Sequence, residues 1–213
     1  MSISVLLSQV AQLALSARSS YREAFQNGQA VLDLFQISST PLRVAHFMAQ
    51  VLHESAGLTV QFENLNYSPE RLPKVWPKRF QPIGPLSPTT YAHNPQKLAN
   101  EVYGGRMGNT EPNDGFTYRG RGLLQLTGRE SYAEATQIAR SSNPEAPNFV
   151  ENPDAAISAR WCLVLAAGEW RSKGCNGLAD HDDIRAVTRA INGGQIGLAE
   201  RTEWLKRTKF IWH

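Results

Sequence analysis

One segment constrains the fold of this chain more than any other, because it has the pattern of a single buried helix. Val44, Met48, Val51 and Leu52 recur at steps of three and four residues, which is the spacing of one apolar helix face. Phe47 widens that face. The pattern predicts a helix that packs its apolar side deep in the core.

The ends of this helix are also marked in the sequence. Ser39 or Thr40 followed by Pro41 is typical of a helix start, and Gly57 fits a helix stop. Further amphipathic or apolar runs predict helices over residues 21–35, 97–103, 128–140, 160–170 and 182–191. The chain therefore reads as mainly α, with at most short strands.

The opposite face of this helix carries His46, Gln50, His53 and Glu54. A carboxylate in the last helical turn meets the negative end of the helix dipole, and a packed neighbourhood disfavours its charge. Both effects raise a pKa, as a general acid near neutral pH requires. The competing interpretation is an ordinary solvated face, although such faces are usually rich in Lys and Glu.

A second carboxylate, Glu63, follows Glu54 by nine residues and precedes the polar Asn64. Two carboxylates in different surroundings suit acid/base chemistry, and glycoside cleavage is the leading example. Two glutamates at this spacing also occur by chance in many proteins, so the spacing alone favours the structural interpretation.

Residues 119–127 alternate, with Leu124 and Leu126 on one side and Gln125 and Thr127 on the other. This alternation predicts an extended segment with one buried face and one face that lines a cleft. An ordinary edge strand would give the same pattern.

Three blocks of this chain resemble glycoside hydrolase family 19, which includes plant-type chitinases and many phage endolysins. They are AHFMAQVLHESAGL with FENLNYSPERL, then YRGRGLLQLTGRESYAEA from Tyr118, then AINGG at residues 190–194. The second block is similar to the family's G-R-G-x-x-Q-L-S/T-G segment. The short spacing from HES to ENLNYSPERL is closest to the phage or prophage lysozyme type.

The resemblance implies a lysozyme-like helical domain with a substrate cleft, formed by residues 1–213 as one catalytic domain with two possible lobes. It implies that Glu54 is the general acid, that Glu63 is the base and that Thr127 holds the attacking water. The residues expected to bind substrate are His53, Asn64, Tyr118, Gln125, Asn192 and Arg201. Asparagine is also common at helix ends, which leaves a structural interpretation open for Asn192.

The composition of the chain limits the classes of binding partner that it predicts. The net charge is only +3, and basic residues gather over 74–79, 119–129 and 201–209. Such clusters could favour an anionic wall polymer, but no nucleic-acid motif accompanies them. Cys162 and Cys175 are expected to be free thiols, and no ligand spacing predicts a metal or a cofactor.

The N-terminal apolar run lacks a positive n-region and is interrupted by Gln9 and Gln12, so it reads as an amphipathic helix. We therefore expect synthesis in the host cytoplasm without a signal peptide, no membrane insertion, a monomer, and action on the wall or periplasm after release. The predicted function is a peptidoglycan-cleaving endolysin, a muramidase that inverts configuration. A chitinase, a glucosaminidase and a non-catalytic glycan-binding module remain the alternatives.

Overall fold

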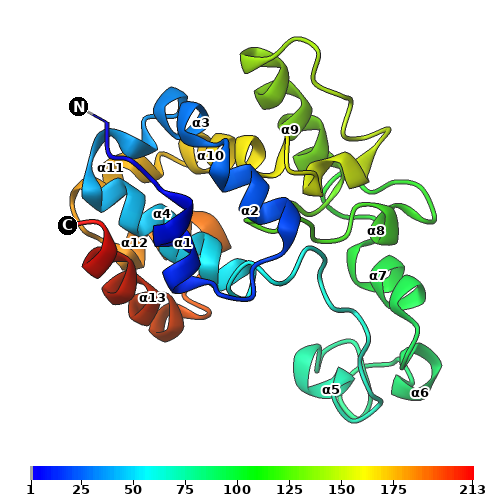
Figure 1. Ribbon diagram of the computed structural model, residues 1–213. Helices are drawn as coiled ribbons and strands as arrows, with labels where there is room; N and C mark the ends of the chain where they lie inside the picture. The colour runs from blue at the N-terminus through cyan, green and yellow to red at the C-terminus, as the bar shows by residue number, and fades with distance from the viewer. Residues whose placement is uncertain (1) are drawn as a thin grey trace. The chain divides into compact units, whose positions relative to one another are not determined.

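The computed structural model describes residues 2–213, and its secondary structure is helical (Figure 1). Among these residues, β structure is limited to isolated bridges such as that between Phe80 and Leu86. The mainly α prediction is therefore confirmed. The helices are α1 (Leu7–Leu13), α2 (Ser19–Gln26), α3 (Gln29–Leu34), η1 (Ile37–Ser39), α4 (Pro41–Glu54), α5 (Leu72–Val75), α6 (Pro88–Tyr91), α7 (Pro95–Tyr103), α8 (Asp114–Thr117), α9 (Arg129–Ser142), η2 (Pro153–Ile157), α10 (Cys162–Ser172), α11 (Cys175–Asp180), α12 (Ile184–Asn192) and α13 (Leu198–Ile211).

The chain divides into two compact units. Unit 1 contains the described residues up to Gln61, together with Arg121–Gln125 and Ala133–His213. Unit 2 contains Phe62–Gly120 and Leu126–Tyr132, so the division falls within α9. Each unit is therefore built from segments that are far apart in the sequence.

Helix α4 forms the centre of unit 1. Every side chain from Val44 to Leu52 is buried, and α13 packs along the helix (Figure 1). Small residues at the contact, Ala45 and Ala49, allow close approach, and the Thr208 hydroxyl of α13 donates to the Ala45 carbonyl at 2.8 Å. The predicted buried helix is therefore present, and it is covered on both faces.

The ends of α4 follow from local chemistry. The Thr40 hydroxyl accepts a hydrogen bond from the Arg43 N–H at 3.2 Å, and Pro41 occupies the first turn. After Glu54 the chain turns through three residues with positive φ, namely Ala56 (48°), Gly57 (68°) and Leu58 (64°). The predicted start and stop are confirmed, and the stop extends beyond the single glycine.

Unit 2 has its own apolar core. Leu65, Leu72 and Phe80 are buried against one face of α7, and aromatic rings complete the cluster. Tyr67 and Trp76 meet edge to face, with ring centroids 5.2 Å apart. The proline-rich segment 69–95 is therefore held in place by its aromatic side chains, which pack into this core.

The predicted extended segment at residues 119–127 is wrong in its central part. Residues 122–125 form a turn, with Gly122 at φ 81° and Gln125 at φ 54°. Leu124 is buried as expected, whereas Leu126 is only half-buried. Alternation over a few residues could not distinguish a strand from a tight turn, because Gly122 permits a left-handed backbone that the pattern does not record.

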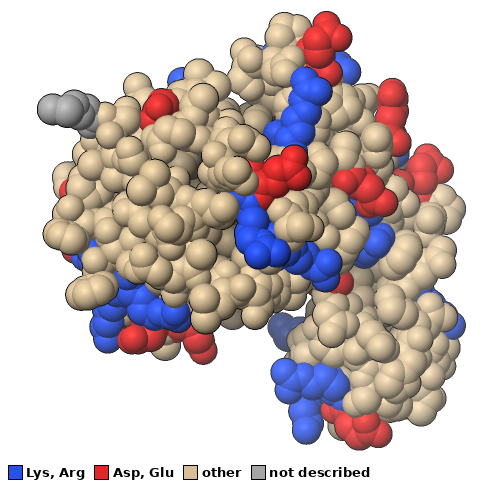
Figure 2. All heavy atoms as spheres, viewed as in Figure 1, with Lys and Arg blue, Asp and Glu red and all other residues tan. Residues whose placement is uncertain are grey.

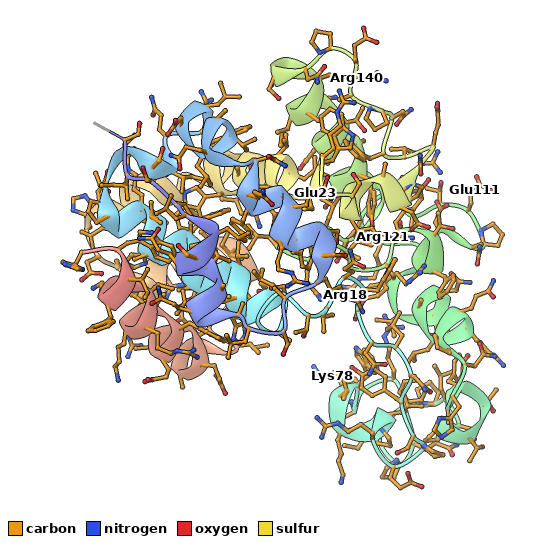
Figure 3. The ribbon with its side chains drawn as sticks, viewed as in Figure 1. Arg18, Glu23, Lys78, Glu111, Arg121 and Arg140 are labelled. Carbon is orange, nitrogen blue, oxygen red and sulfur yellow. The ribbon has the colours of Figure 1, made fainter. Side chains whose placement is uncertain are left out.

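The basic clusters expected from the sequence are largely neutralised. Arg121 (Figure 3) is 4% exposed and pairs with Asp154 at 2.9 Å, and Lys209 pairs with Asp182 at 2.5 Å. On the face shown in Figure 2, basic and acidic side chains lie beside one another in several places. These local pairs weaken the argument that charge alone selects an anionic polymer.

Both cysteines are buried and free, Cys162 in α10 and Cys175 at the start of α11. Burial raises the pKa of each thiol to about 12, so both are protonated thiols near neutral pH. None of the helices within residues 2–213 is both long and apolar enough to cross a membrane.

Candidate active site

Glu54, the last residue of α4, is bound by a buried arginine. Arg201 of α13 is 2% exposed; its Nη2 donates to Glu54 Oε1, and its Nη1 donates to Gln50 Oε1. Gln50 is fully buried one turn before Glu54. The polar stripe of α4 is therefore an internal polar contact between two helices, and its interpretation as a solvated face is wrong.

A further carboxylate belongs to this charge cluster. Glu169 interrupts the otherwise buried run of α10, and burial raises its pKa, with the charge of Glu54 acting in the same direction. Lys173 lies 3.3 Å from Glu169 and opposes that rise. Glu169 was not among the predicted site residues, although a single charged residue inside an apolar helix was a usable signal.

His53 lies between Glu54 and the loop that begins α13. Its imidazole is partly buried, and burial together with the Arg201 charge lowers its pKa, so the ring is neutral near pH 7. Gly197 approaches closely enough that a Cβ there would lie 2.5 Å from His53 Nε2. The absence of a side chain at Gly197 is thus what leaves room for this imidazole.

Glu63 is held separately, within unit 2. Its backbone N–H donates to the Gly120 carbonyl at 2.9 Å, and the Tyr103 hydroxyl donates to its Oε1 at 2.5 Å. Its Oε2 is buried and accepts no hydrogen bond from any residue in the described range 2–213. Burial raises the pKa of Glu63, while the Tyr103 hydrogen bond and the Arg119 charge act against that rise.

A carboxylate with a raised pKa is a stronger base once it has lost its proton, and Brønsted behaviour favours a base whose pKa approaches the working pH. In the structure, burial raises the pKa of Glu63 in this direction. The contact of Glu54 with Arg201 was implied only loosely by the resemblance, which matched Arg201 to a basic residue near the acid.

The division between the two units separates Gln125 from Thr127. Gln125 ends the 122–125 turn in unit 1 and is half-buried, and its left-handed backbone orients its side chain differently from that of a strand residue. Thr127 is half-buried in unit 2, just before Gly128, whose N–H donates to the Tyr118 carbonyl at 2.8 Å.

The remaining predicted substrate ligands have local structural contacts. Tyr118 is 4% exposed and packs on Tyr132, with ring centroids 5.3 Å apart, so its ring belongs to the core of unit 2. Exposed Asn64 accepts from the Asn66 N–H at 2.9 Å, and exposed Asn192 donates to the Ile196 carbonyl at 3.4 Å. Tyr118 and Arg201 are thus buried, whereas both asparagines have surfaces that a ligand can reach.

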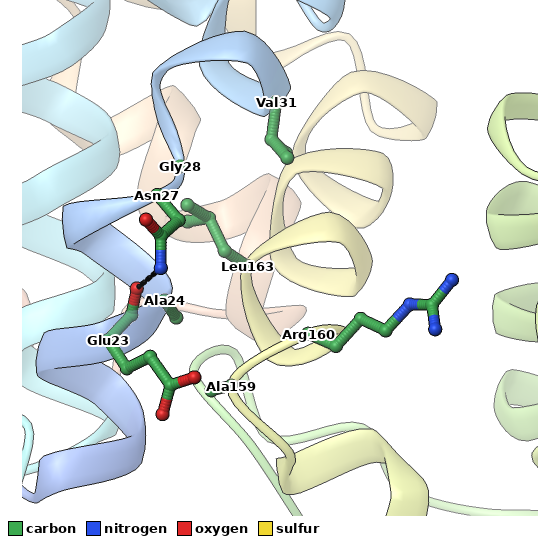
Figure 4. A pocket seen from close by; sticks show the side chains of 8 residues that line it. All are labelled: Glu23, Ala24, Asn27, Gly28, Val31, Ala159, Arg160 and Leu163. Carbon is green, nitrogen blue, oxygen red and sulfur yellow. Dashed lines mark hydrogen bonds between the residues drawn. The ribbon is translucent and has the colours of Figure 1, made fainter.

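A cavity of about 330 Å³ lies in unit 1, between α2, α3 and the start of α10 (Figure 4). The side chains that line it include Glu23, Asn27 and Arg160, together with apolar Val31 and Leu163. None of the predicted site residues lines this cavity.

No family model matches the chain. A protein of Haemophilus influenzae described as "Glycosyl hydrolase family 19 domain-containing protein" is 37% identical over 163 residues, which is 75% of each chain. Among solved structures, chitinase C from Streptomyces griseus matches with a TM-score of 0.59 and 16% identity, over 99% of this chain and 93% of that one.

A second solved structure, described as a bacterial family 19 chitinase, matches with a TM-score of 0.60 and 19% identity. The match covers 99% of this chain and 95% of that chain. At these sequence identities the solved structures show the fold alone, which is a lysozyme-like helical architecture.

Proposed function

The chain belongs to glycosyl hydrolase family 19, and from this premise we propose that it is an endolysin that hydrolyses the β-1,4 glycosidic bonds of bacterial peptidoglycan. In this proposal the enzyme is a muramidase that uses two carboxylates and no covalent intermediate. The observation that carries the proposal is that Glu54 and Glu63 are each held by a polar contact within their own unit, Glu54 by Arg201 and Glu63 by Tyr103.

In the proposed reaction, Glu54 protonates the departing glycosidic oxygen while Glu63 removes a proton from the attacking water. The Thr127 hydroxyl suits the role of a second anchor for that water, since a hydroxyl both donates and accepts hydrogen bonds. Arg201 holds the carboxyl group of Glu54 in place from inside α13. An inverting pair of this kind needs its carboxyl groups about 6.5–9.5 Å apart, because the water must fit between them.

Peptidoglycan is favoured as the substrate by the nine-residue interval between the two glutamates and by the lysin-like segment ENLNYSPERL. Mass spectrometry of borohydride-reduced digests of purified peptidoglycan tests this choice. A muramidase leaves N-acetylmuramic acid at the new reducing ends. Reducing ends on N-acetylglucosamine would reassign the enzyme as a glucosaminidase.

Chitin hydrolysis is the second candidate, because the two solved structures named above are described as chitinases. Parallel digests of chitin oligomers and peptidoglycan separate the two substrates. We expect little turnover of chitin oligomers, and brisk chitin hydrolysis with intact peptidoglycan would establish a chitinase. Binding to either polymer without any cleavage would instead identify a glycan-binding module.

A further inference from the structure

The shortest contact of the Glu63 side chain is with Tyr103, the last residue of α7. The phenol oxygen lies 2.5 Å from Glu63 Oε1, the length of a charge-assisted O–H···O⁻ hydrogen bond. The two residues are 40 positions apart in the sequence. The other carboxylate oxygen, Oε2, is buried and accepts no hydrogen bond from the residues that the structure describes.

Tyr103 is fixed by contacts that do not involve Glu63. Helix α7 begins at Pro95, where the Asn94 side chain accepts the Lys97 N–H, and its buried face packs into the core of unit 2. Beyond the helix, buried Asn109 donates from Nδ2 to the Tyr103 carbonyl at 3.0 Å. Asn109 Oδ1 also accepts from the Arg129 N–H at 2.9 Å, which ties this loop to the start of α9.

Glu63 is fixed just as independently, through its backbone bond to Gly120. Two side chains anchored on separate segments meet at one hydrogen bond, so the bond sets the rotation of the carboxyl group and not the position of the backbone. Locking the rotamer of a reactive group in this way is what a preorganised site requires.

We propose that Tyr103 is a positioning residue for Glu63: its hydrogen bond to Oε1 sets the orientation of the carboxyl group that takes the proton from the attacking water. The inference rests on the proposed function, in which Glu63 is the base. Tyr103 itself neither gains nor loses a proton: the water proton moves to the Glu63 carboxylate as the water oxygen bonds to the sugar carbon, and the phenol stays a donor throughout.

The electrostatic surroundings of Tyr103 keep its phenol protonated, so it remains a hydrogen-bond donor. Burial, followed by the Glu63 charge, raises the pKa of Tyr103, so its phenol keeps its proton across the working pH range. The other ionisable groups that act on this pair are Tyr67, Arg106 and Arg119. Among the contributions to the Glu63 pKa, the Tyr103 hydrogen bond is the largest that lowers it.

Tyr103→Phe removes the hydroxyl and keeps the ring. We expect kcat to fall roughly 10- to 100-fold, the loss expected for one hydrogen bond to a charged group, with KM nearly unchanged. Removal of a bond that lowers the Glu63 pKa raises that pKa. Because the base must be unprotonated, the acid limb of the kcat/KM profile should move to higher pH.

Tyr91→Phe is the matched control. Tyr91 packs on the same apolar cluster and its hydroxyl also donates to a glutamate, Glu101 Oε2, at 3.3 Å. We expect this variant to keep the wild-type kcat and pH profile. Equal effects of the two variants, or a lower kcat for Tyr103→Phe with an unmoved acid limb, would show that Tyr103 serves only the stability of unit 2.

A measurement without substrate keeps this inference separate from the proposed function. Titration of the Glu63 carboxyl carbon by ¹³C NMR should give a higher pKa in Tyr103→Phe than in the wild type or in Tyr91→Phe. An unmoved titration overturns the positioning role. If the titration moves but neither glycan is cleaved by the wild type, the contact stands, and both the proposed function and the catalytic part of the inference fail.

Discussion

At the scale of single residues, the ion pair between Glu54 and Arg201 couples catalysis to stability. Arg201 is almost fully buried, and its Nε has no hydrogen-bond partner among residues 2–213. Its counter-ion is Glu54, so loss of the Glu54 charge leaves a buried guanidinium without that partner.

We therefore expect Glu54→Gln to lower both turnover and stability. Loss of a general acid should reduce the rate by about two to four orders of magnitude. The free energy of unfolding should fall by about 1–3 kcal/mol, the cost of an incompletely satisfied buried group. The amide oxygen can still accept from Arg201, which keeps the loss below the roughly 3–5 kcal/mol of deleting one partner of a buried pair.

Turbidity assays on permeabilised cells and urea unfolding measure the two effects. Glu203→Gln is the control, since Glu203 forms an exposed pair with Lys206 on the same helix and such pairs contribute little. A Glu54→Gln variant with more than about a tenth of wild-type activity would contradict the role of Glu54 as the general acid, for which at least a hundredfold loss is expected.

At the scale of elements, the turn at Gly197, where α13 begins, positions the helix that carries Arg201. Gly197 precedes α13 at φ 73°, and the Arg201 N–H donates to the Gly197 carbonyl at 2.9 Å. Any Cβ at this position meets the His53 ring at 2.5 Å. The conformation of Gly197 therefore affects the start of α13, the space for the His53 imidazole and the backbone of Arg201.

Gly197→Ala should lower the free energy of unfolding by more than about 1 kcal/mol, because alanine is strained at a positive φ and displaces His53. Activity should fall with it, since α13 carries Arg201. Urea denaturation monitored by tryptophan fluorescence gives the stability change.

Gly177→Ala is the opposite case and the matched control. Gly177 lies within α11, its φ is not in the left-handed region, and a Cβ added there would meet no atom within 4 Å. This substitution should stabilise the protein by about 0.4–1 kcal/mol. A loss of stability of the same size in both variants would mean that the contact with His53 is not the cause.

At the scale of the whole molecule, the proposed reaction needs Glu54 of unit 1 and Glu63 of unit 2 to act on one bond. The Tyr103 hydrogen bond holds the Glu63 carboxyl group in one orientation, as proton removal from a positioned water requires. A carboxylate nucleophile would have to stand closer to the acid, at about 5–5.5 Å.

Hydrolysis of a β-linked oligosaccharide should consequently release the α-anomer first. Proton NMR of a fresh digest detects the anomer before mutarotation equilibrates it, and a retaining glycosidase acting on the same oligosaccharide serves as the reference. Initial β product would contradict the inverting scheme and would point to a covalent intermediate or to participation by the substrate's own acetamido group.

Local patterns determined much of this protein. The limits of α4, its Thr40 cap and its buried apolar face were predictable, because periodicity and capping involve residues within a few positions of one another. Three sequence blocks also sufficed to indicate the family, which the 37% identical relative shows.

Only the tertiary structure decided how the polar residues are paired. Arg201 meets Glu54 across 147 positions, and Tyr103 meets Glu63 across 40, so neither partner could be read from a local pattern. The same holds for the turn at Gly122, where a left-handed backbone replaced an expected strand. Periodicity tells which face of a segment is apolar, whereas the partner of a polar side chain depends on which distant segment packs against it.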